Sequence, residues 1–328
     1  MTTAALGLHH VTAIAGDPQR NVDFYAGVLG LRLVKQTVNF DDPGSYHLYY
    51  GDASGRPGSI VTFFAWPGAR RGRQGTGQVA VLSLSIPAAS VGAWVARLVK
   101  LGVHFEGPTR RFDEQVLSLK DPDGLLVELV ADAAGDRREP WADGPVAAEH
   151  AVRGIHGVSI WSDGDRGTAR VLAGALGARE LRRDEERVRW ALGDGRPGEL
   201  VDVREVRGFW SGVIAVGTIH HVAWRADDDA HQEALAAQVR QLGLAITEQL
   251  DRKYFRSMYF REPGGVLFEL ATDEPGFAVD EPAERLGSRL MLPPWLEEVR
   301  GQLESSLPPI HVPGATGDAA APAAKAAR

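Results

Sequence analysis

The sequence predicts an α+β fold made of four copies of one βαβββ unit. Three features predict it: a strand-like segment that recurs four times, an amphipathic helical pattern after each copy, and a Pro-Gly turn with an apolar run that ends each unit. Each unit spans roughly 50–60 residues. A unit of this size cannot bury its own sheet face, so the units are expected to pair.

The first strand of each unit has a recognisable motif. LHHVTAI (residues 8–14), IHGVSIW (155–161) and IHHVAWR (219–225) each carry a His near the start, whereas QVAVLSLSI (78–86) carries none. Apolar runs of this length are typical of buried strands. A helical pattern with apolar residues at i, i+3 and i+4 and a closing Gly follows each motif. These helices are expected over residues 21–30, 91–102, 169–177 and 233–243.

The ends of the units also match one another. Residues 121–132 (DPDGLLVELVAD) and 262–273 (EPGGVLFELATD) agree position by position, and 56–64 (RPGSIVTFF) and 196–203 (RPGELVDV) follow the same frame. A turn followed by an apolar run predicts a final strand in each unit. When the Pro-Gly turns are aligned, the equivalent positions on these last strands are Phe63, Glu128, Val203 and Glu269.

Composition excludes several kinds of site and partner. The 328 residues contain no Cys, so any metal must be held by His and carboxylate groups. The formal net charge of −7 argues against nucleic acid or an anionic membrane as the main partner. No apolar run reaches the roughly 18 residues of a membrane helix. Residues 1–17 lack the basic and apolar regions of a secretory signal, so we expect a cytoplasmic protein.

Over about residues 6–275, the repeated unit resembles the βαβββ module of the vicinal oxygen chelate superfamily. That superfamily includes glyoxalase I, fosfomycin and bleomycin resistance proteins, and extradiol dioxygenases. The resemblance implies that the modules pair into two mixed-sheet half-barrel domains. It also implies that the first and last strands of both partners reach one cavity, so that each module offers two ligand positions.

Metal ligands are expected from modules one and four. On the first strands, the position before Val holds His10, Gly157 and His221 in modules one, three and four. With the last-strand acids included, modules two and three supply only Glu128, whereas modules one and four supply His10, His221 and Glu269. Two His and one carboxylate form the ligand set of non-haem Fe(II) oxygenases. We therefore expect Fe(II), with Mn(II) as the alternative.

The choice within each His pair rests on strand parity. Neighbouring residues of a regular strand face opposite ways, so His9 and His10 cannot both point at one ion, nor can His220 and His221. The residue before Val is the metal position in the superfamily pattern, which selects His10 and His221. The reverse assignment stays open. His9 and His220 are expected to support the ligands or to act as acid and base.

Several strings resemble the hydroquinone ring-cleaving branch of the extradiol dioxygenases. They include LHHVTA, VKQTVNFDDPGSYHLYYGD, IHHVAW and DRKYFRSMYFREPGGVLFEL. The resemblance implies a small aromatic substrate and O2 as reactants, with Thr12 near the substrate. Tyr259 is a candidate hydrogen-bonding group on the strand that pairs with the strand of Glu269. Arg256, or else Arg252, is expected to steady the anion that forms as the ring opens.

Other polar residues are interpreted more simply. His47 and His156 are expected to be structural, and Glu128 is expected to be a vestigial ligand. Tyr46, Tyr49 and Tyr50 are expected to be strand residues, one of which is a weaker candidate for the pocket wall.

The expected domains are residues 1–135 (modules one and two) and 150–275 (modules three and four). An extension with a short helix after Pro294 is expected over 276–306. The Ala- and Pro-rich segment 307–328 is expected to be disordered. Self-association into a homo-oligomer is a further expectation from the family.

Two other functions remain open at this stage. One is a metal-dependent isomerase or transferase of the glyoxalase kind, against which Phe63 at a second acid position argues. The other is a binding protein that sequesters an aromatic compound without turnover.

Overall fold

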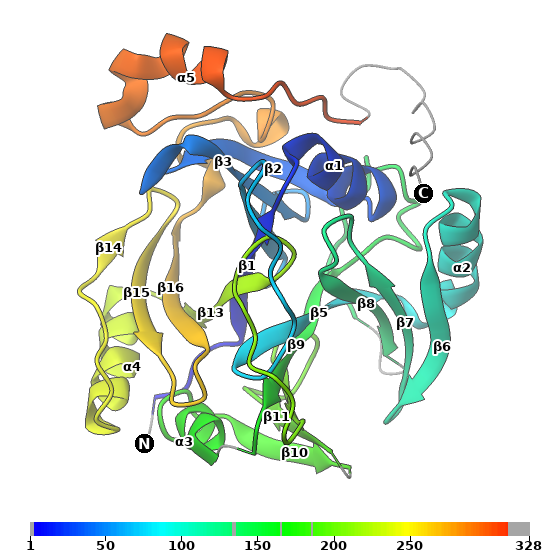
Figure 1. The fold of residues 1–328 in the computed structure, drawn as a ribbon, viewed down its shortest axis with the longest axis vertical. Coiled ribbons are helices and arrows are strands. Elements are labelled where there is room, and N and C mark those ends of the chain that lie inside the picture. Colours follow the sequence, from blue (N-terminus) through cyan, green and yellow to red (C-terminus); the bar gives the residue numbers. More distant parts are fainter. Residues whose placement is uncertain (1–2, 133–135, 165, 185, 314–328) are drawn as a thin grey trace.

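The computed structural model describes residues 3–132, 136–164, 166–184 and 186–313, and it has the predicted four βαβββ modules (Figure 1). Module one contains β1 (Leu8–Ala15), α1 (Pro18–Val22) with a π-helical turn (Asp23–Val28), β2 (Arg32–Asn39), β3 (Asp42–Gly51) and β4 (Ile60–Ala65). Module two contains β5 (Gln78–Ile86), a 3-10 turn (Ala88–Ser90), α2 (Val91–Lys100), β6 (Phe105–Arg111), β7 (Glu114–Lys120) and β8 (Leu126–Asp132).

The second half of the chain repeats this order. Module three contains β9 (Gly154–Ser162), α3 (Arg166–Gly174), β10 (Arg179–Arg183), β11 (Arg187–Ala191) and β12 (Leu200–Glu205). Module four contains β13 (Ile219–Ala226), α4 (Asp229–Gln241), β14 (Leu250–Asp251), β15 (Phe255–Arg261) and β16 (Leu267–Pro275). Capping residues fix two of the helix starts. The side chains of Asp17 and Asp228 accept hydrogen bonds from the backbone N–H groups of Arg20 and His231.

The modules pair across the two halves of the chain. One eight-stranded sheet has the order β14-β15-β16-β13-β1-β4-β3-β2, and the other has the order β10-β11-β12-β9-β5-β8-β7-β6. Within each module the first and last strands run parallel, whereas β1 with β13 and β5 with β9 join the modules in antiparallel fashion. Module one therefore shares a sheet with module four, and module two with module three. The predicted α+β half-barrel fold is confirmed.

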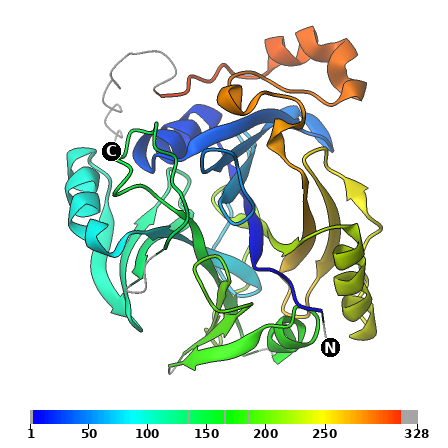
Figure 2. The ribbon, with the colours of Figure 1, turned by 180° about the vertical axis from the view of Figure 1, so that it is seen from behind.

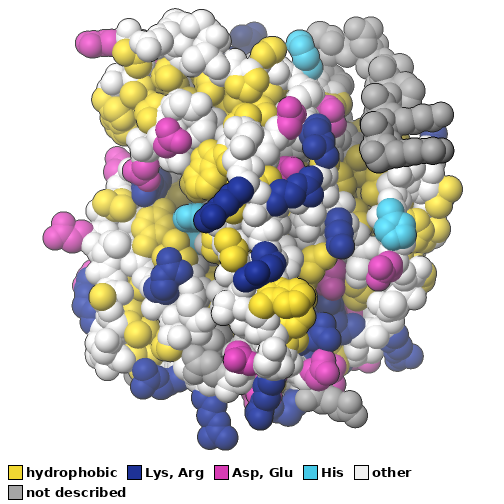
Figure 3. All heavy atoms as spheres, viewed as in Figure 1, with side chains coloured by type: hydrophobic (Ala, Val, Ile, Leu, Met, Phe, Trp, Pro, Cys, Tyr) yellow, Lys and Arg dark blue, Asp and Glu magenta, His cyan; other side chains and the backbone are white. Residues whose placement is uncertain are grey.

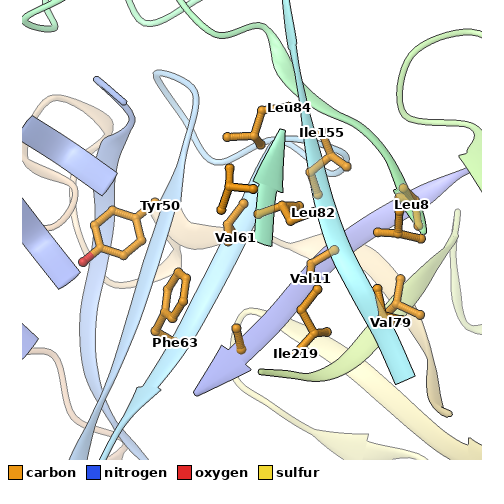
Figure 4. Close-up of a cluster of buried hydrophobic side chains, with 14 of the residues drawn as sticks. Leu8, Val11, Tyr50, Val61, Phe63, Val79, Leu82, Leu84, Ile155 and Ile219 are labelled. Atoms are coloured by element: carbon orange, nitrogen blue, oxygen red, sulfur yellow. The ribbon is translucent and has the colours of Figure 1, made fainter. Parts of the chain in front are cut away.

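The hydrophobic core lies where the central strands of the two sheets approach each other. Figure 4 shows Val11 and Val61 of the first sheet among Val79, Leu82 and Ile155 of the second. All five side chains are buried, so this contact withdraws a large apolar area from water. It fixes the position of β1, the strand that carries His10.

A C-terminal extension crosses the outer edge of the first sheet (Figures 1 and 2). It contains 3-10 turns at Phe277–Val279, Ala283–Arg285 and Pro294–Val299 and helix α5 (Arg300–Ser306). Buried Lys35 on the edge strand β2 donates to Asp280 over 2.6 Å and also pairs with Glu281. The extension thereby covers an edge that would otherwise expose unpaired backbone groups.

The surface and the chain ends add few constraints on function. On the face seen in Figure 3, Lys and Arg side chains are scattered among acidic and apolar ones. Within the described residues no helix is long and apolar enough to cross a bilayer.

Of the segment expected to be disordered, residues 307–313 are described: Leu307 is buried, and His311 exchanges hydrogen bonds with Gln19. The remainder, 314–328, lies outside the described residues, and the domain boundaries stay a prediction.

Candidate metal centre and aromatic pocket

The structure brings His10, His221 and Glu269 together on the concave face of the first sheet. They come from β1, β13 and β16, which are adjacent strands. The Nε2 atoms of His221 and His10 lie 2.9 and 3.3 Å from Glu269 Oε2. One ligand atom from each residue lies within 4.8 Å of the other two. Residues more than two hundred positions apart in the chain thus form one cluster.

This cluster fits a divalent cation. All three side chains are buried, and Glu269 is fully so. Ser257 donates a hydrogen bond to Glu269 Oε1 over 2.5 Å, while Oε2 has no hydrogen-bond partner in the described part of the chain. Burial alone would raise the pKa of Glu269, but His10 and His221 lower it well below its usual value, which keeps the carboxylate ionised. A buried, ionised oxygen without a hydrogen bond, facing two imidazole nitrogens, is suited to a metal.

His9 and His220 support the two candidate ligands in the same way. His9 Nδ1 lies 2.9 Å from His10 Nδ1, and His220 Nδ1 lies 2.7 Å from His221 Nδ1. Burial lowers the pKa of both His9 and His220 to about 3, so both rings are neutral. If each ligand donates from Nδ1, its Nε2 presents a lone pair toward Glu269. The arrangement agrees with the predicted choice of His10 and His221, whose role as ligands stays a prediction.

A pocket opens directly beside the three residues. Thr12 and Tyr259 line it, as expected, together with the aromatic rings of Phe40, Phe64 and Phe255. Apolar and aromatic walls around a few polar groups are typical of sites for small aromatic molecules.

The structure favours Arg252 over Arg256 for contact with a substrate. Arg252 lines the pocket, and its guanidinium lies 5.6 Å from the centre of the Tyr259 ring. Arg256 faces away and pairs with Asp229 of α4. Strand alternation explains this placement: Phe255 lines the pocket and Ser257 bonds to Glu269, so Arg256 between them faces the other side of the sheet, toward α4. The sequence-based choice of Arg256 is therefore not supported.

Sequence reasoning missed His47 and ranked Tyr49 too low. Both line the pocket from β3, although His47 had been interpreted as structural. The His47 ring lies between Tyr49 and Phe64, with ring centres 4.1 and 4.4 Å away. The spacing of two residues on one strand was the available signal, since i and i+2 share a face.

The structure corrects two of the four last-strand positions. Phe63 lies beside Tyr50 in the hydrophobic core (Figure 4), and the residue paired with Thr12 on the concave face is Thr62. Likewise Asp202, rather than Val203, pairs with Ser159 of the adjacent first strand. The four turns match at the Gly residues, which all have positive φ, rather than at Pro. Counting four residues from Gly58, Gly124, Gly198 and Gly265 gives Thr62, Glu128, Asp202 and Glu269.

On the corresponding face of the second sheet, the two last-strand positions hold acids, Glu128 and Asp202. Each is paired with arginine: Glu128 with Arg111 over 2.7 Å, and Asp202 with Arg189 over 2.7 Å and Arg187 over 2.9 Å. Arg189 also bonds to buried Glu114. As expected for a structural residue, His156 contacts Glu114 over 2.8 Å.

Comparison with known proteins agrees with this fold. The family model of the Glyoxalase/Bleomycin resistance protein/Dioxygenase superfamily matches residues 7–129 and 166–270. The chain belongs to this superfamily. A candidate ring-cleaving dioxygenase of Bacillus subtilis (strain 168), MhqO, is 44% identical over 312 residues, which cover 95% of this chain and 99% of the relative. The chlorohydroquinone/hydroquinone 1,2-dioxygenase of Sphingobium indicum is 35% identical, with 90% and 94% covered.

Solved structures support the same assignment. A crystal structure of a candidate dioxygenase from Bacillus subtilis has a TM-score of 0.90 and 43% identity, covering 95% of this chain and 99% of that one. Glyoxalase I from Zea mays has a TM-score of 0.61 at 18% identity, covering 81% and 92%, and shows the likeness of the fold alone. Since relatives over nearly the whole chain are named as ring-cleaving dioxygenases, the expected enzyme class is confirmed.

Proposed function

We propose that this superfamily member is an Fe(II)-dependent, extradiol-type dioxygenase that opens the ring of hydroquinones or related phenols with O2. The observation that carries the proposal is the group His10, His221 and Glu269 beside an aromatic pocket. Two His and one carboxylate leave open coordination positions, which suits iron oxygenases. The hydroquinone dioxygenase among the relatives supports this substrate class. Mn(II) is the alternative metal.

The metal would be held by Nε2 of His10, Nε2 of His221 and Oε2 of Glu269. When bound, the ion would supply Lewis acidity that favours the ionised form of a substrate hydroxyl. The buried walls keep bulk water away from the ring. Phe40, Phe64 and Phe255 offer faces and edges against which an aromatic ring packs.

Polar groups around this position would orient the substrate and handle charge. Arg252 is a permanent cation at the pocket wall, and it also pairs with Asp41 over 3.2 Å at the pocket mouth. Its charge would stabilise an anionic substrate oxygen. Burial raises the pKa of Tyr259 well above its usual value, so its phenol stays protonated and donates a hydrogen bond. His220 is neutral, since burial lowers its pKa to about 3, and its Nδ1 faces His221 Nδ1 over 2.7 Å, so in this proposal it holds the ligand in place.

The test is turnover with defined metal and substrate. Protein purified without oxygen is loaded with Fe(II), mixed with hydroquinone, chlorohydroquinone or catechol, and then exposed to labelled dioxygen. We expect oxygen consumption and a ring-opened acid that contains both labelled atoms. Turnover of a hemithioacetal with Ni(II) or Zn(II), and none of the phenols with Fe(II), would instead indicate a glyoxalase-like isomerase. Tight binding of the phenols without turnover would indicate a sequestering protein.

The small aromatic substrate and O2 are the reactants of this proposal. A cytoplasmic location and self-association into a homo-oligomer stay predictions from the sequence.

A further inference from the structure

A line of hydrogen-bonded side chains crosses the concave face of the first sheet beside the metal ligands. Thr62 Oγ1 lies 3.0 Å from Thr12 Oγ1 and 2.7 Å from His47 Nε2. The Tyr49 hydroxyl lies 2.9 Å from His47 Nδ1. The four residues come from β1, β4 and β3, which are adjacent strands, and Thr12 stands two residues after His10 on the same face. The chain therefore connects the pocket wall to the position beside the metal ligands.

The hydrogen atoms in this chain have one favoured direction. His47 is neutral, since burial and the nearby His10 and His221 lower its pKa well below the usual value, so its ring carries a single N–H. With the hydrogen on Nε2, Tyr49 donates to Nδ1, Nε2 donates to Thr62, and Thr62 donates to Thr12. Every donor in the chain then has an acceptor, and the Thr12 hydroxyl is left to donate into the pocket.

The opposite direction is disfavoured. With the hydrogen on Nδ1, His47 would donate to the Tyr49 oxygen, and the Tyr49 hydroxyl would need another acceptor. No other described residue accepts from it, and Tyr49 is only 2% exposed, so that acceptor would have to come from a molecule in the pocket. A buried donor without an acceptor costs about 1–3 kcal/mol. In that state Thr12 would donate to Thr62 and would present only lone pairs to the pocket.

The hydrogen-bonded chain ends at the Tyr49 hydroxyl, which is buried at the pocket wall and does not reach the outer surface, so the chain does not export protons to solvent. Burial raises the pKa of the Tyr49 phenol well above its usual value, so Tyr49 does not ionise to pass a proton onward. Phe277 packs 5.1 Å from the Tyr49 ring and fixes its position. The chain is thus suited to orienting a donor rather than to carrying protons to solvent.

We propose that Tyr49, His47 and Thr62 form a polarised hydrogen-bond chain that makes Thr12 a donor to an ionised oxygen of the substrate. The inference rests on the proposed function, because it assigns to the same pocket a preference for a phenolate over a neutral phenol. Thr12 touches the substrate, whereas Thr62, His47 and Tyr49 are positioning residues that act through it. This oxygen is the place where a hydroquinone or a similar phenol differs from a plain aromatic hydrocarbon.

The test uses 4-nitrophenol, whose absorbance separates the yellow phenolate from the neutral phenol. The probe is titrated without oxygen into the full chain as purified, with the metal content matched between variants. The fraction of bound probe in the phenolate form and its dissociation constant are measured at one pH. This measurement needs no turnover. A wild-type protein that does not cleave rings, and a hydrogen-bond chain that does not orient Thr12, would therefore be separate results.

We expect Thr12→Val to weaken phenolate binding by about tenfold, the effect of one hydrogen bond to a charged group. Thr62→Val and Tyr49→Phe should reproduce a large part of that loss, about three- to tenfold, and Thr62→Ser should restore binding. In the Thr12→Val background, Thr62→Val should have no further effect, because the two residues act as a unit. Tyr50→Phe is the matched control, since the Tyr50 hydroxyl bonds to Asn21 on the other face of β3.

Three results would overturn the proposal. One is wild-type affinity and phenolate fraction in both Thr62→Val and Tyr49→Phe while Thr12→Val is impaired. Another is additive loss in the Thr12→Val, Thr62→Val double variant. The last is a wild-type protein that does not bind the probe. Thermal melting of each variant shows whether a lost affinity reflects unfolding, and Thr62→Ser distinguishes loss of the hydroxyl from loss of packing.

Discussion

The two sheets place acids at equivalent positions, yet among the described residues only those of the first sheet form a candidate metal site. In the first sheet, Glu269 faces two neutral imidazoles, and its Oε2 has no hydrogen-bond partner among the described residues. In the second sheet, arginines neutralise Glu128 and Asp202. His221 and Gly157 occupy the same position on their strands, so the second face also lacks the imidazole. The two faces therefore differ in what neutralises their buried acids: arginines on the second face, and two imidazoles on the first, where a cation could bind.

The largest expected effect on activity comes from removing the carboxylate of the candidate metal site on the first sheet. Glu269→Gln keeps the shape of the side chain but removes the charged oxygen, and it should reduce ring cleavage by more than about 100-fold, with loss of bound metal, because even residues behind the ligands contribute 10–100-fold. Oxygen uptake and elemental analysis measure this. The matched variant is Glu128→Gln on the second face, which should keep both metal content and turnover. Equal losses in both variants would contradict the comparison.

Next is the buried ion network of the second face. Glu114→Ala removes one of the carboxylates that pair with the buried guanidinium of Arg189. The substitution should lower the free energy of unfolding by about 3–5 kcal/mol. Turnover per folded molecule should stay at the wild-type level. Denaturant unfolding measures the change, and Glu180→Ala, in an exposed pair with Arg183, should leave stability nearly unchanged. A stable Glu114→Ala protein with impaired turnover would reverse the roles assigned to the two faces.

A smaller effect is expected from the histidines that hydrogen-bond to the candidate ligands. His220→Ala removes the ring that holds His221 Nδ1, so metal affinity should fall about 10–100-fold. His156 occupies the same place in module three and contacts Glu114 instead. His156→Ala should therefore leave metal affinity unchanged. Metal competition with a chelator measures both, and unchanged affinity in His220→Ala would exclude a supporting role.

Stability should also depend on pH through the second face. Burial would raise the pKa of Glu114, but its bonds to His156 and Arg189 lower that pKa below the usual value. In the same way, burial would raise the pKa of Asp202, but Arg189 lowers it. Groups whose pKa falls on folding stabilise the protein above the pKa of the unfolded chain, about 4, and lose that contribution as the pH falls. Stability should thus decrease on acidification below about pH 4. The decrease should be shallower in Glu114→Gln, and equal slopes would contradict this assignment.

The sequence predicted the fold and the candidate ligands because both rest on short repeated patterns. The motifs around His10 and His221 and the run around Glu269 mark strand starts and ends that the four modules share. Strand parity limited the choice to one His of each pair, and the superfamily pattern then selected His10 and His221. Pairing of module one with module four follows from the same ligand set and is visible in the sheet order.

What the sequence did not predict depends on single-residue shifts and on distant partners. The alignment at Pro misplaced Thr62 and Asp202 by one residue, because the turns coincide at the Gly with positive φ. Arg256 was chosen without applying strand alternation: it lies between Phe255 and Ser257, which face the pocket side, so it faces α4 and Arg252 reaches the pocket instead. The arginines that neutralise the second face come from several strands, and no local pattern relates them to the acids that they contact.

The most direct test is to locate the metal in crystals of protein purified without oxygen, with anomalous diffraction at the iron absorption edge. We expect one anomalous peak per chain, bounded by His10, His221 and Glu269, and none beside Glu128 and Asp202. A peak on the second face, or full catalytic activity in protein with no peak between those three residues, would contradict it.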